Sequence, residues 1–359
     1  MQEARSSLVQ VFEQRNPDYL PIWYMRQAGR YLPEYNELRK GKTFLDLSTN
    51  PKLSIEISLQ PHRRYGLDGI IMFSDILTPV HGAGIPLHFE EGRGPVLEKT
   101  IREESELSII SDYRPDRDNG YVGETLQGIR EYIQGLNASG TDAQPAPPPT
   151  LIGFAGAPFT LASYIVEGAT TRKFEQTKRS AFRDTKFFLK LLDRLAEITI
   201  EYLGYQIENG AEVLQLFDSW GGILAGDDYE EFSGQFNRKI LDALRSRHSE
   251  KFKFIMFTGN SSHLVGRIAA MKPDGISLDW RTEQRDIDAI DSSIAVQGCM
   301  DPLVLYGDRE RVIRETRKNI SRFAGRKHIF NLGHGIHPST PLENVQAMIE
   351  TVRSHRDNT

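Results

Sequence analysis

Eight short apolar runs recur along the chain, and each one ends in a polar or glycine-rich stretch. Ile, Val, Leu and Phe dominate these runs, with little of the polar alternation that a half-exposed strand shows. Continuous apolar strands of this length are typical of parallel sheets that are covered on both faces. We therefore expect eight parallel β-strands, at residues 20–25, 69–73, 151–154, 213–217, 252–257, 275–278, 294–297 and 328–332.

Apolar positions at helical spacing fill most of the intervals between these runs. The long interval 181–208 predicts one helix or two, and shorter helices are expected at 228–247, 261–271, 308–323 and 342–353. Strands that alternate with helices predict an α/β protein, and eight such units favour a closed (β/α)8 TIM barrel. An open doubly wound sheet is the alternative, although the Gly-x-Gly-x-x-Gly pattern of dinucleotide-binding folds is absent after the first run.

The interval 79–150 is longer than one barrel helix requires, and it contains no strong strand pattern. Residues 81–95 predict loops or a short hairpin, and residues 124–134 predict a helix. The stretch 139–149 holds Asp142 and four prolines, which predict a flexible surface loop. We expect 79–150 to be an elaborated loop-and-helix insertion between the second and third strands, inside a single domain that covers residues 1–359.

Composition and charge limit the partners and the cell compartment that we expect for the protein. A net charge of −5 and a pI near 6.0 do not favour binding to nucleic acid or to an anionic membrane surface. No apolar run approaches the roughly 20 residues that span a bilayer. Cys299 is the single cysteine of the chain, so an intramolecular disulfide and a cysteine-rich zinc site are excluded. We expect a cytoplasmic protein in a reducing environment.

Polar side chains and glycines follow every one of the eight runs. In a (β/α)8 barrel the carboxyl ends of the strands form the catalytic face, so these residues are expected to surround one site. Any one of them has a simpler explanation, since Asp218 and Ser219 could cap a helix and Gly333 and Gly335 could turn the chain. The residues in question are Arg26 and Arg30; Ser74 and Asp75; Tyr164; Asp218 and Ser219; Asn260; Asp279 to Arg281; Cys299; and His334.

Missing residue types exclude several reaction classes. No lysine ends a strand, so a Schiff-base enzyme lacks its nucleophile. No His-x-His follows the first run, and the glycines and proline around His334 and His337 do not favour a helical metal pair. Cys299 has no evident basic neighbour in the sequence, so we expect a small buried thiol there and no nucleophile.

Two arginines four residues apart stand where the first strand opens into a loop. Arg26 and Arg30 each offer a planar fork of donors that stays charged near pH 7. The pair predicts a ligand that carries carboxylates or phosphates, although two solvated surface arginines would give the same local sequence.

Long ordered segments then identify a resemblance that runs from about residue 8 to about residue 352. The chain resembles the uroporphyrinogen decarboxylase family, which implies a cytosolic or plastid homodimer of (β/α)8 barrels that needs no metal and no organic cofactor. The implied reaction converts the four acetate side chains of uroporphyrinogen III to methyl groups, giving coproporphyrinogen III and carbon dioxide. The matching segments are residues 21–35, 73–77, 153–160, 217–220 and 331–336.

The resemblance also implies which residues act. It assigns catalytic roles to Asp75, Arg26 and Tyr164. It implies substrate contacts from Arg26, Gln27, Ala28, Gly29, Arg30, Asp75, Tyr164, Ser219 and His334. The sequence departs from the family at Cys299, where an asparagine is usual, so a polar contact near that strand end is expected to be lost or shifted.

Two other functions are compatible with parts of this pattern. A cobalamin-linked methyltransferase of the same superfamily would need a zinc site with a His-x-Cys pair, whereas the fifth run ends in Thr258 and Gly259. A tetrapyrrole-binding protein without catalysis would bind the porphyrinogen but release no carbon dioxide. The presence of Arg26, Arg30, Asp75 and Tyr164 together argues against this second alternative.

Overall fold

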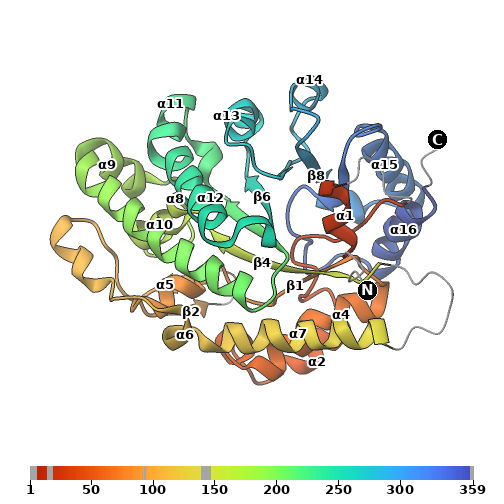
Figure 1. Cartoon of the computed structure of the whole chain (residues 1–359), viewed down its shortest axis with the longest axis horizontal. Helices are drawn as coiled ribbons and strands as arrows, with labels where there is room; N and C mark the ends of the chain where they lie inside the picture. Colours follow the sequence, from red (N-terminus) through yellow and green to blue (C-terminus); the bar gives the residue numbers. More distant parts are fainter. Residues whose placement is uncertain (1–5, 14–18, 91, 93, 139–146, 356–359) are drawn as a thin grey trace.

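The computed structural model describes residues 6–13, 19–90, 92, 94–138 and 147–355. Within them, seven parallel strands form one curled sheet in the order β1-β4-β5-β6-β7-β8-β9, with helices around its outer side (Figure 1). Seven of the eight predicted runs coincide with these strands. The strands are β1 (Gly69–Ile71), β4 (Thr150–Gly156), β5 (Val213–Asp218), β6 (Lys253–Thr258), β7 (Gly275–Ser277), β8 (Ala295–Met300) and β9 (His328–Leu332).

The first predicted strand, 20–25, is present only as an isolated parallel bridge between Ile22 and Phe330. Pro21 has no N–H to donate to a ladder, and Arg26 turns out of extended geometry with φ 62°. The backbone nevertheless bonds to the outer strand β9 and to the residue that precedes the other outer strand, β1. The Phe330 N–H donates to the Pro21 carbonyl at 2.9 Å on the β9 side, and the Asp68 N–H donates to the Ile22 carbonyl at 2.9 Å next to β1.

The helices follow the strands with a few departures from expectation. The interval 181–208 contains two helices, because Asp184 accepts from the Phe187 N–H and caps the second one. The interval 228–247 contains a π-helical turn before its main helix.

The described helices outside the interval 79–150 are α1 (Ser7–Glu13), α2 (Pro33–Leu38), α3 (Phe44–Ser48), α4 (Pro51–Tyr65), α8 (Pro158–Glu167), α9 (Glu175–Arg183), α10 (Thr185–Glu208), α11 (Gly226–Tyr229), η3 (Glu230–Gly234), α12 (Gln235–His248), α13 (Val265–Ala270), α14 (Gln284–Asp288), α15 (Arg309–Ser321) and α16 (Leu342–Arg353). Short turns are η2 (Gly221–Ile223), η4 (Ser249–Lys251), η5 (Ser262–Leu264) and η6 (Pro302–Tyr306).

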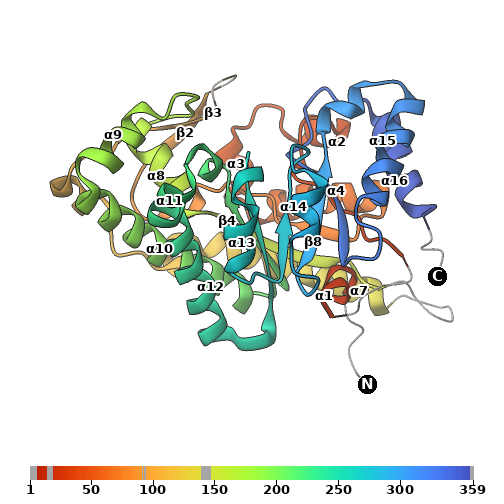
Figure 2. The ribbon, with the colours of Figure 1, turned by 90° about the horizontal axis from the view of Figure 1, so that it is seen from above.

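The chain between β1 and β4 contains no strand of the parallel sheet in its described part. It comprises α5 (Thr78–Gly82), an antiparallel hairpin of β2 (Leu87–Glu90) and β3 (Gly94–Leu97), η1 (Glu104–Ile109), α6 (Pro115–Asp118) and α7 (Gly120–Ala138). The hairpin lies beside the end of α8, where the Leu97 N–H donates to the Gly168 carbonyl (Figure 2). The predicted loop 139–149 lies outside the described residues except for its last three prolines.

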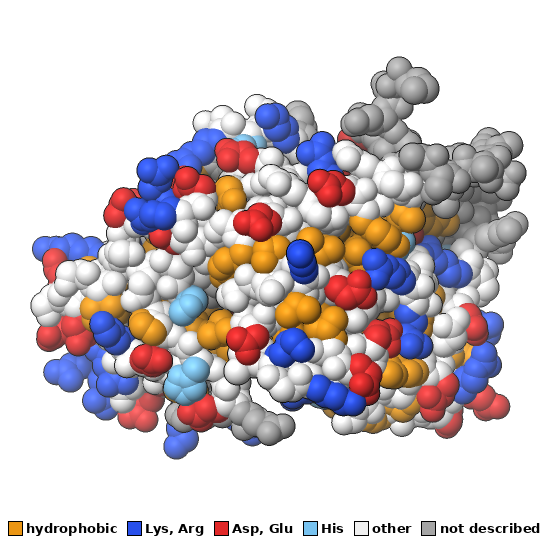
Figure 3. All heavy atoms as spheres, turned by 90° about the horizontal axis from the view of Figure 1, so that it is seen from below, with side chains coloured by type: hydrophobic (Ala, Val, Ile, Leu, Met, Phe, Trp, Pro, Cys, Tyr) orange, Lys and Arg blue, Asp and Glu red, His pale blue; other side chains and the backbone are white. Residues whose placement is uncertain are grey.

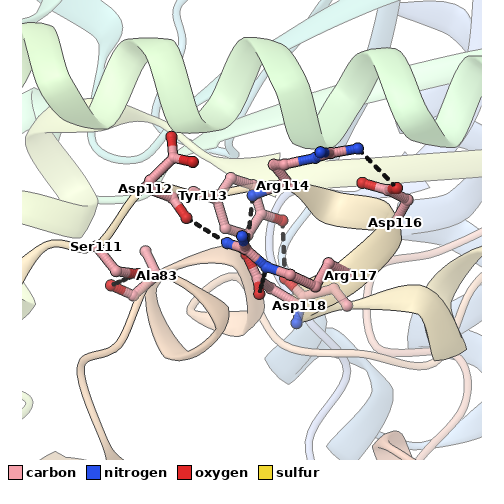
Figure 4. A network of polar contacts seen from close by, with 9 residues as sticks. Ala83, Ser111, Asp112, Tyr113, Arg114, Asp116, Arg117 and Asp118 are labelled. Carbon is pink, nitrogen blue, oxygen red and sulfur yellow. Dashed lines mark hydrogen bonds and ion pairs between the residues drawn. The ribbon is translucent and has the colours of Figure 1, made fainter.

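Polar contacts hold the turn that leads into α7. Arg117 donates to the Asp112 carbonyl and to the Asp118 carboxylate, and Arg114 pairs with Asp116 (Figure 4). The Ser111 N–H also bonds to the Ala83 carbonyl, which ties this turn back to α5. These bonds brace the long connection internally, and the Leu97–Gly168 bond fastens it to the end of α8.

The inside of the curled sheet is filled by side chains. An apolar cluster joins residues of the sheet with Leu8, Val11 and Phe12 of α1, which covers the amino ends of the strands. Next to it lies a buried polar network in which Trp23 Nε1 donates to Gln297 Oε1 at 2.9 Å. Gln297 Nε2 in turn donates to Gln215 Oε1 and Ser277 Oγ. The interior is therefore a packed core with its own internal hydrogen bonds.

The surface carries charges of both signs. On the face shown in Figure 3, basic and acidic side chains are interspersed, with hydrophobic side chains between them. Among the described residues, no helix is both long and apolar enough to cross a bilayer.

Candidate functional site

The predicted site residues stand at the carboxyl ends of the strands. Because all seven strands are parallel, these ends lie at one edge of the sheet, which we call the mouth. Asp75 follows β1, Tyr164 lies in α8 directly after β4, Ser219 follows β5, and His334 follows β9. Arg26 follows the bridged segment beside β9 and β1.

Arg26 is held by the end of β9 and by the loop that follows it. The Met25 N–H donates to Asn331 Oδ1 at 3.1 Å, and the Ile336 N–H donates to the Met25 carbonyl at 3.0 Å. Arg26 itself adopts a left-handed conformation, which is uncommon for a residue other than glycine. Its side chain then lies along Gly335, where an added β-carbon would stand 2.3 Å from Arg26 Cδ.

Asp75 sits in a tight turn that orients its carboxylate. Its Oδ1 accepts from the Leu77 N–H at 2.8 Å, and its own N–H faces Thr78 Oγ1. Burial raises the pKa of Asp75, while the Leu77 N–H and then the Arg26 guanidinium act in the opposite direction. Arg26 and Asp75 therefore lie close enough for the guanidinium to influence the carboxyl group.

Tyr164 joins this pair from the next strand. Burial raises the pKa of its hydroxyl, and the Asp75 carboxylate raises it further. The Tyr164 ring packs against Trp220, with centroids 6.2 Å apart, and Trp220 packs in turn against Phe174. At neutral pH Tyr164 is thus a neutral phenol beside a carboxylate, able to donate one hydrogen bond.

His334 follows β9, the last strand in the sheet order. The pKa of His334 is lowered to about 4, chiefly because the surrounding protein desolvates the ring, and to a lesser extent by the nearby Arg26, His337 and Arg281 side chains. Its ring contacts Phe257, with centroids 6.3 Å apart, and rings at 5.6 and 5.7 Å continue through Phe217 to Phe154. His334 is therefore a neutral hydrogen-bonding group at the end of a row of aromatic rings.

That row of rings was missed in the sequence. Phe154, Phe217 and Phe257 come from the three adjacent strands β4, β5 and β6. A signal was present, because each is an aromatic residue near the end of its apolar run. Together these three rings form an apolar surface next to the charged groups of the mouth.

The remaining predicted residues differ in whether their side chains are free to contact a substrate. Gln27 is fully buried, and its side chain accepts from the Tyr24 N–H and donates to the Gly69 carbonyl, so it serves the fold. Ala28 and Gly29 are partly exposed in the same turn. Arg30 is exposed, and its carbonyl accepts from Asn36. Ser219 is partly exposed after β5, but no described contact links Arg30 or Ser219 to Asp75.

Asp218, next to Ser219, has a structural role. Its buried carboxylate accepts hydrogen bonds from Thr160, Ser233 and Asn237. The pKa of Asp218 is raised to about 6, because the effect of burial outweighs that of these bonds. Asp218 therefore fixes α8 and the η3–α12 segment to β5 and does not open to the mouth.

Cys299 has a basic neighbour, contrary to the expectation from the sequence. Arg322 Nη1 lies 3.1 Å from Cys299 Sγ, and burial still raises the pKa of the thiol to about 11. The cation comes from α15 and its following turn, so the pairing is a tertiary contact. The thiol remains protonated, which agrees with an unreactive packed side chain.

Within the described residues, no three His, Cys, Asp or Glu side chains gather so that they could hold a metal ion. Arg26, Asp75, Tyr164 and His334 are the predicted residues that the structure brings together. Chemically, this group can bind carboxylates, stabilise a positive charge and donate neutral hydrogen bonds.

Comparison with known proteins agrees with this chemistry. The sequence matches the family described as uroporphyrinogen decarboxylase (URO-D) over residues 3–355. A protein named uroporphyrinogen decarboxylase from Pseudoalteromonas atlantica is 40% identical, over 94% of this chain and 93% of that relative. Another of that name from Synechococcus sp. (strain JA-2-3B'a(2-13)) is 39% identical, over 94% and 93% of the two chains.

Solved structures share the fold at lower identity. A methyltransferase from Methanosarcina mazei superposes with a TM-score of 0.77 at 19% identity, covering 96% of both chains. A B12-independent methionine synthase from Shewanella sp. W3-18-1 gives a TM-score of 0.53 at 12% identity, covering 93% of both chains. At these identities the similarity concerns the fold alone.

Proposed function

This chain belongs to the uroporphyrinogen decarboxylase family, and we propose that the mouth of its sheet is the place where that reaction occurs. The chain is a decarboxylase of tetrapyrrole biosynthesis. It converts the four acetate side chains of uroporphyrinogen III to methyl groups, with release of four carbon dioxide molecules and formation of coproporphyrinogen III. The observation that carries the placement is the convergence of Arg26, Asp75, Tyr164 and His334 at the carboxyl ends of parallel strands.

The substrate supplies its own electron sink. A pyrrole carbon next to the acetate accepts a proton, and the ring becomes cationic. The bond between the acetate methylene and its carboxyl group then breaks, its electron pair enters the ring, and carbon dioxide leaves. A second proton adds to the methylene carbon, and the first proton leaves the ring carbon. Each cycle consumes one proton and needs no lysine or oxidant.

Asp75 is proposed to stabilise the cationic ring. The Leu77 N–H orients one carboxylate oxygen and favours the ionised form. A carboxylate at about 4 Å from a unit positive charge, at an effective dielectric of 20, contributes roughly 4 kcal/mol. That corresponds to about a thousandfold in rate, if it acts only in the transition state.

The arginines are proposed to bind the carboxylate side chains. Arg26 would hold a reacting acetate or a water that delivers the proton, because a guanidinium with a pKa above about 12 is a poor acid. Arg30, Ser219 and His334 would contact outer carboxylates or ring N–H groups. The segment of Gln27, Ala28 and Gly29 would contribute through its backbone, since the Gln27 side chain is already bonded within the fold.

Several finer features follow from the family resemblance and remain part of this proposal. We infer that residues 20–25 act as an eighth strand that closes the sheet into a barrel, supported by their bonds to β9 and to the start of β1. We infer one domain over 1–359, with 79–150 as an insertion in it. We further propose a cytoplasmic homodimer that acts without metal or organic cofactor.

One assay tests the reaction. Purified protein is incubated with uroporphyrinogen III under anaerobic, reducing conditions, and the products are oxidised and separated by chromatography. We expect hepta-, hexa-, penta- and tetracarboxylate porphyrins to appear in sequence. Binding of substrate without these products would instead identify a tetrapyrrole-binding protein that lacks catalysis.

A further inference from the structure

A third arginine stands on the rim of the mouth, outside the set that the family resemblance assigns. Arg281 follows β7, after Asp279 and Trp280, and its side chain is about half exposed. It does not extend freely into solvent, because its guanidinium lies 4.3 Å above the centre of the Trp280 ring. An arginine held over an aromatic face keeps its fork of donors in a defined plane.

The support beneath Arg281 is buried. Asp279 is 2% exposed, and its Oδ1 accepts from the Arg281 N–H at 2.8 Å. Its Oδ2 accepts from the Asn260 N–H at 2.9 Å and lies 3.4 Å from Arg281 Nη1. Asp279 thus links the loops after β6 and β7 and orients the guanidinium, while the other guanidinium donors have no acceptor among the described residues.

The Trp280 ring is fixed against the loop after β9. A β-carbon at Gly333 would stand 2.9 Å from Trp280 Cε3, so the ring occupies the space that this glycine leaves. His334 follows immediately in the chain. The platform that carries Arg281 is therefore packed onto the same loop that carries His334 and that holds Arg26 through Gly335.

Arg281 and Arg26 lie near the same histidine. Both guanidiniums lower the pKa of His334, in addition to the larger effect of burial. One arginine comes from the segment beside β1 and the other from β7, so they approach His334 from different strands. The mouth consequently has a cationic edge formed by Arg26 and Arg281, with the neutral His334 near both.

We propose that Arg281 is a substrate-binding residue that holds a carboxylate side chain of the tetrapyrrole, as the second arm of a clamp whose first arm is Arg26. This inference rests on the proposed function. The substrate carries eight carboxylates, whereas the protein has a net charge of −5. The positive charge that attracts the substrate must therefore be concentrated at the binding site. A guanidinium with free donors, preorganised by a ring and a buried carboxylate, suits that requirement.

The test compares Arg281→Gln and Arg281→Lys with a matched control, Arg285→Gln. Arg285 lies only four residues away and is exposed on α14, where it pairs with Glu283. We expect Arg281→Gln to raise KM for uroporphyrinogen III about tenfold, with kcat changed less than twofold, because a remote carboxylate contact is present in ground and transition states alike. Arg281→Lys should recover part of the loss, and Arg285→Gln should match the parent.

A binding measurement separates this inference from the proposed function. Equilibrium dialysis of the protein against coproporphyrin III, a tetracarboxylate, should give about tenfold weaker binding for Arg281→Gln than for the parent and for Arg285→Gln. If the parent protein decarboxylates normally but neither KM nor porphyrin binding changes in Arg281→Gln, Arg281 has only a structural role. If the parent releases no carbon dioxide, the proposed function fails, and dialysis alone decides the role of Arg281.

Discussion

The side chain of Arg26 lies over Gly335 so closely that a β-carbon at Gly335 would stand 2.3 Å from Arg26 Cδ. The φ angle of Gly335 is one that any residue can adopt. A glycine is needed there because a side chain would collide with Arg26. The glycine leaves room for the arginine to cross the loop after β9 and reach the region of Asp75 and His334. The position of Arg26 thus depends on a residue more than 300 positions away in the chain.

Gly335→Ala should therefore displace Arg26 without unfolding the protein. We expect kcat/KM for uroporphyrinogen III to fall about 100-fold, which is a loss of roughly 3 kcal/mol in transition-state stabilisation. Thermal unfolding should shift by only a few degrees. The control is Gly266→Ala, at an exposed position of helix α13, where an added β-carbon meets nothing within 4 Å and full activity is expected. Unchanged activity in Gly335→Ala would contradict the role given to Arg26.

Asp75→Asn tests the stabilisation of the cationic ring. The amide keeps the shape and can still accept from the Leu77 N–H, but it carries no negative charge. We expect kcat to fall about a thousandfold, following the roughly 4 kcal/mol ascribed to the carboxylate. Because burial raises the pKa of Asp75, its charge does not favour the folded state, and urea unfolding at neutral pH should show equal or greater stability. A variant with normal turnover would refute the mechanism.

Asp218 should make stability depend on pH. Its pKa is about 6 in the folded protein against 3.8 for the ordinary carboxyl, mainly because it is buried. The folded state therefore keeps this proton at a pH where the unfolded chain releases it. The resulting stability is complete below about pH 4 and is lost as the pH rises through about 6, by up to roughly 3 kcal/mol.

In Asp218→Asn this part of the pH dependence should disappear. Urea unfolding at several values between about pH 4 and 7 would measure it. Asp291→Asn serves as the control that should leave this part of the profile unchanged, because bonds to Ser293 lower the pKa of that exposed carboxyl further below the measured range. A pH profile that is the same for Asp218→Asn and the parent would show that Asp218 does not titrate in this range.

Cys299 should resist thiol reagents in the folded protein. It is 1% exposed, and its pKa is raised to about 11 by burial despite the nearby Arg322. We expect almost no reaction with a disulfide reagent near pH 8, and one thiol per chain after unfolding in guanidinium chloride. Rapid modification of the native protein, with loss of activity, would reveal an accessible thiolate and contradict the packing described here.

The sequence predicted elements well where a local pattern determines them. Seven apolar runs became strands because their burial on both faces leaves a continuous apolar signature. The run 20–25 carries the same signature, yet Pro21 and the turn at Arg26 leave only one bridge. An apolar run indicates that a segment is buried. A strand also requires successive backbone hydrogen bonds to its neighbours, which an apolar run does not guarantee.

Contacts between distant segments could not be predicted in this way. The sequence placed Arg26, Asp75, Tyr164 and His334 at strand ends, and parallel topology brought them together. By contrast, the Arg322 cation beside Cys299 comes from a turn 23 residues later, and nothing local indicates it. The clearance that Gly335 gives to Arg26 is likewise invisible until the two loops are in place.

The packed interior has a consequence for the supply of protons. Helix α1 covers the amino ends of the strands with Leu8, Val11 and Phe12, and apolar side chains of the sheet fill the space above it. Proton transfer from solvent needs a chain of water or of titratable groups, and the side chains of this cluster are apolar. With the substrate bound at the mouth, as proposed, we expect the protons that the reaction consumes to enter from that side, so that the bound macrocycle itself limits the access of solvent acid to the site.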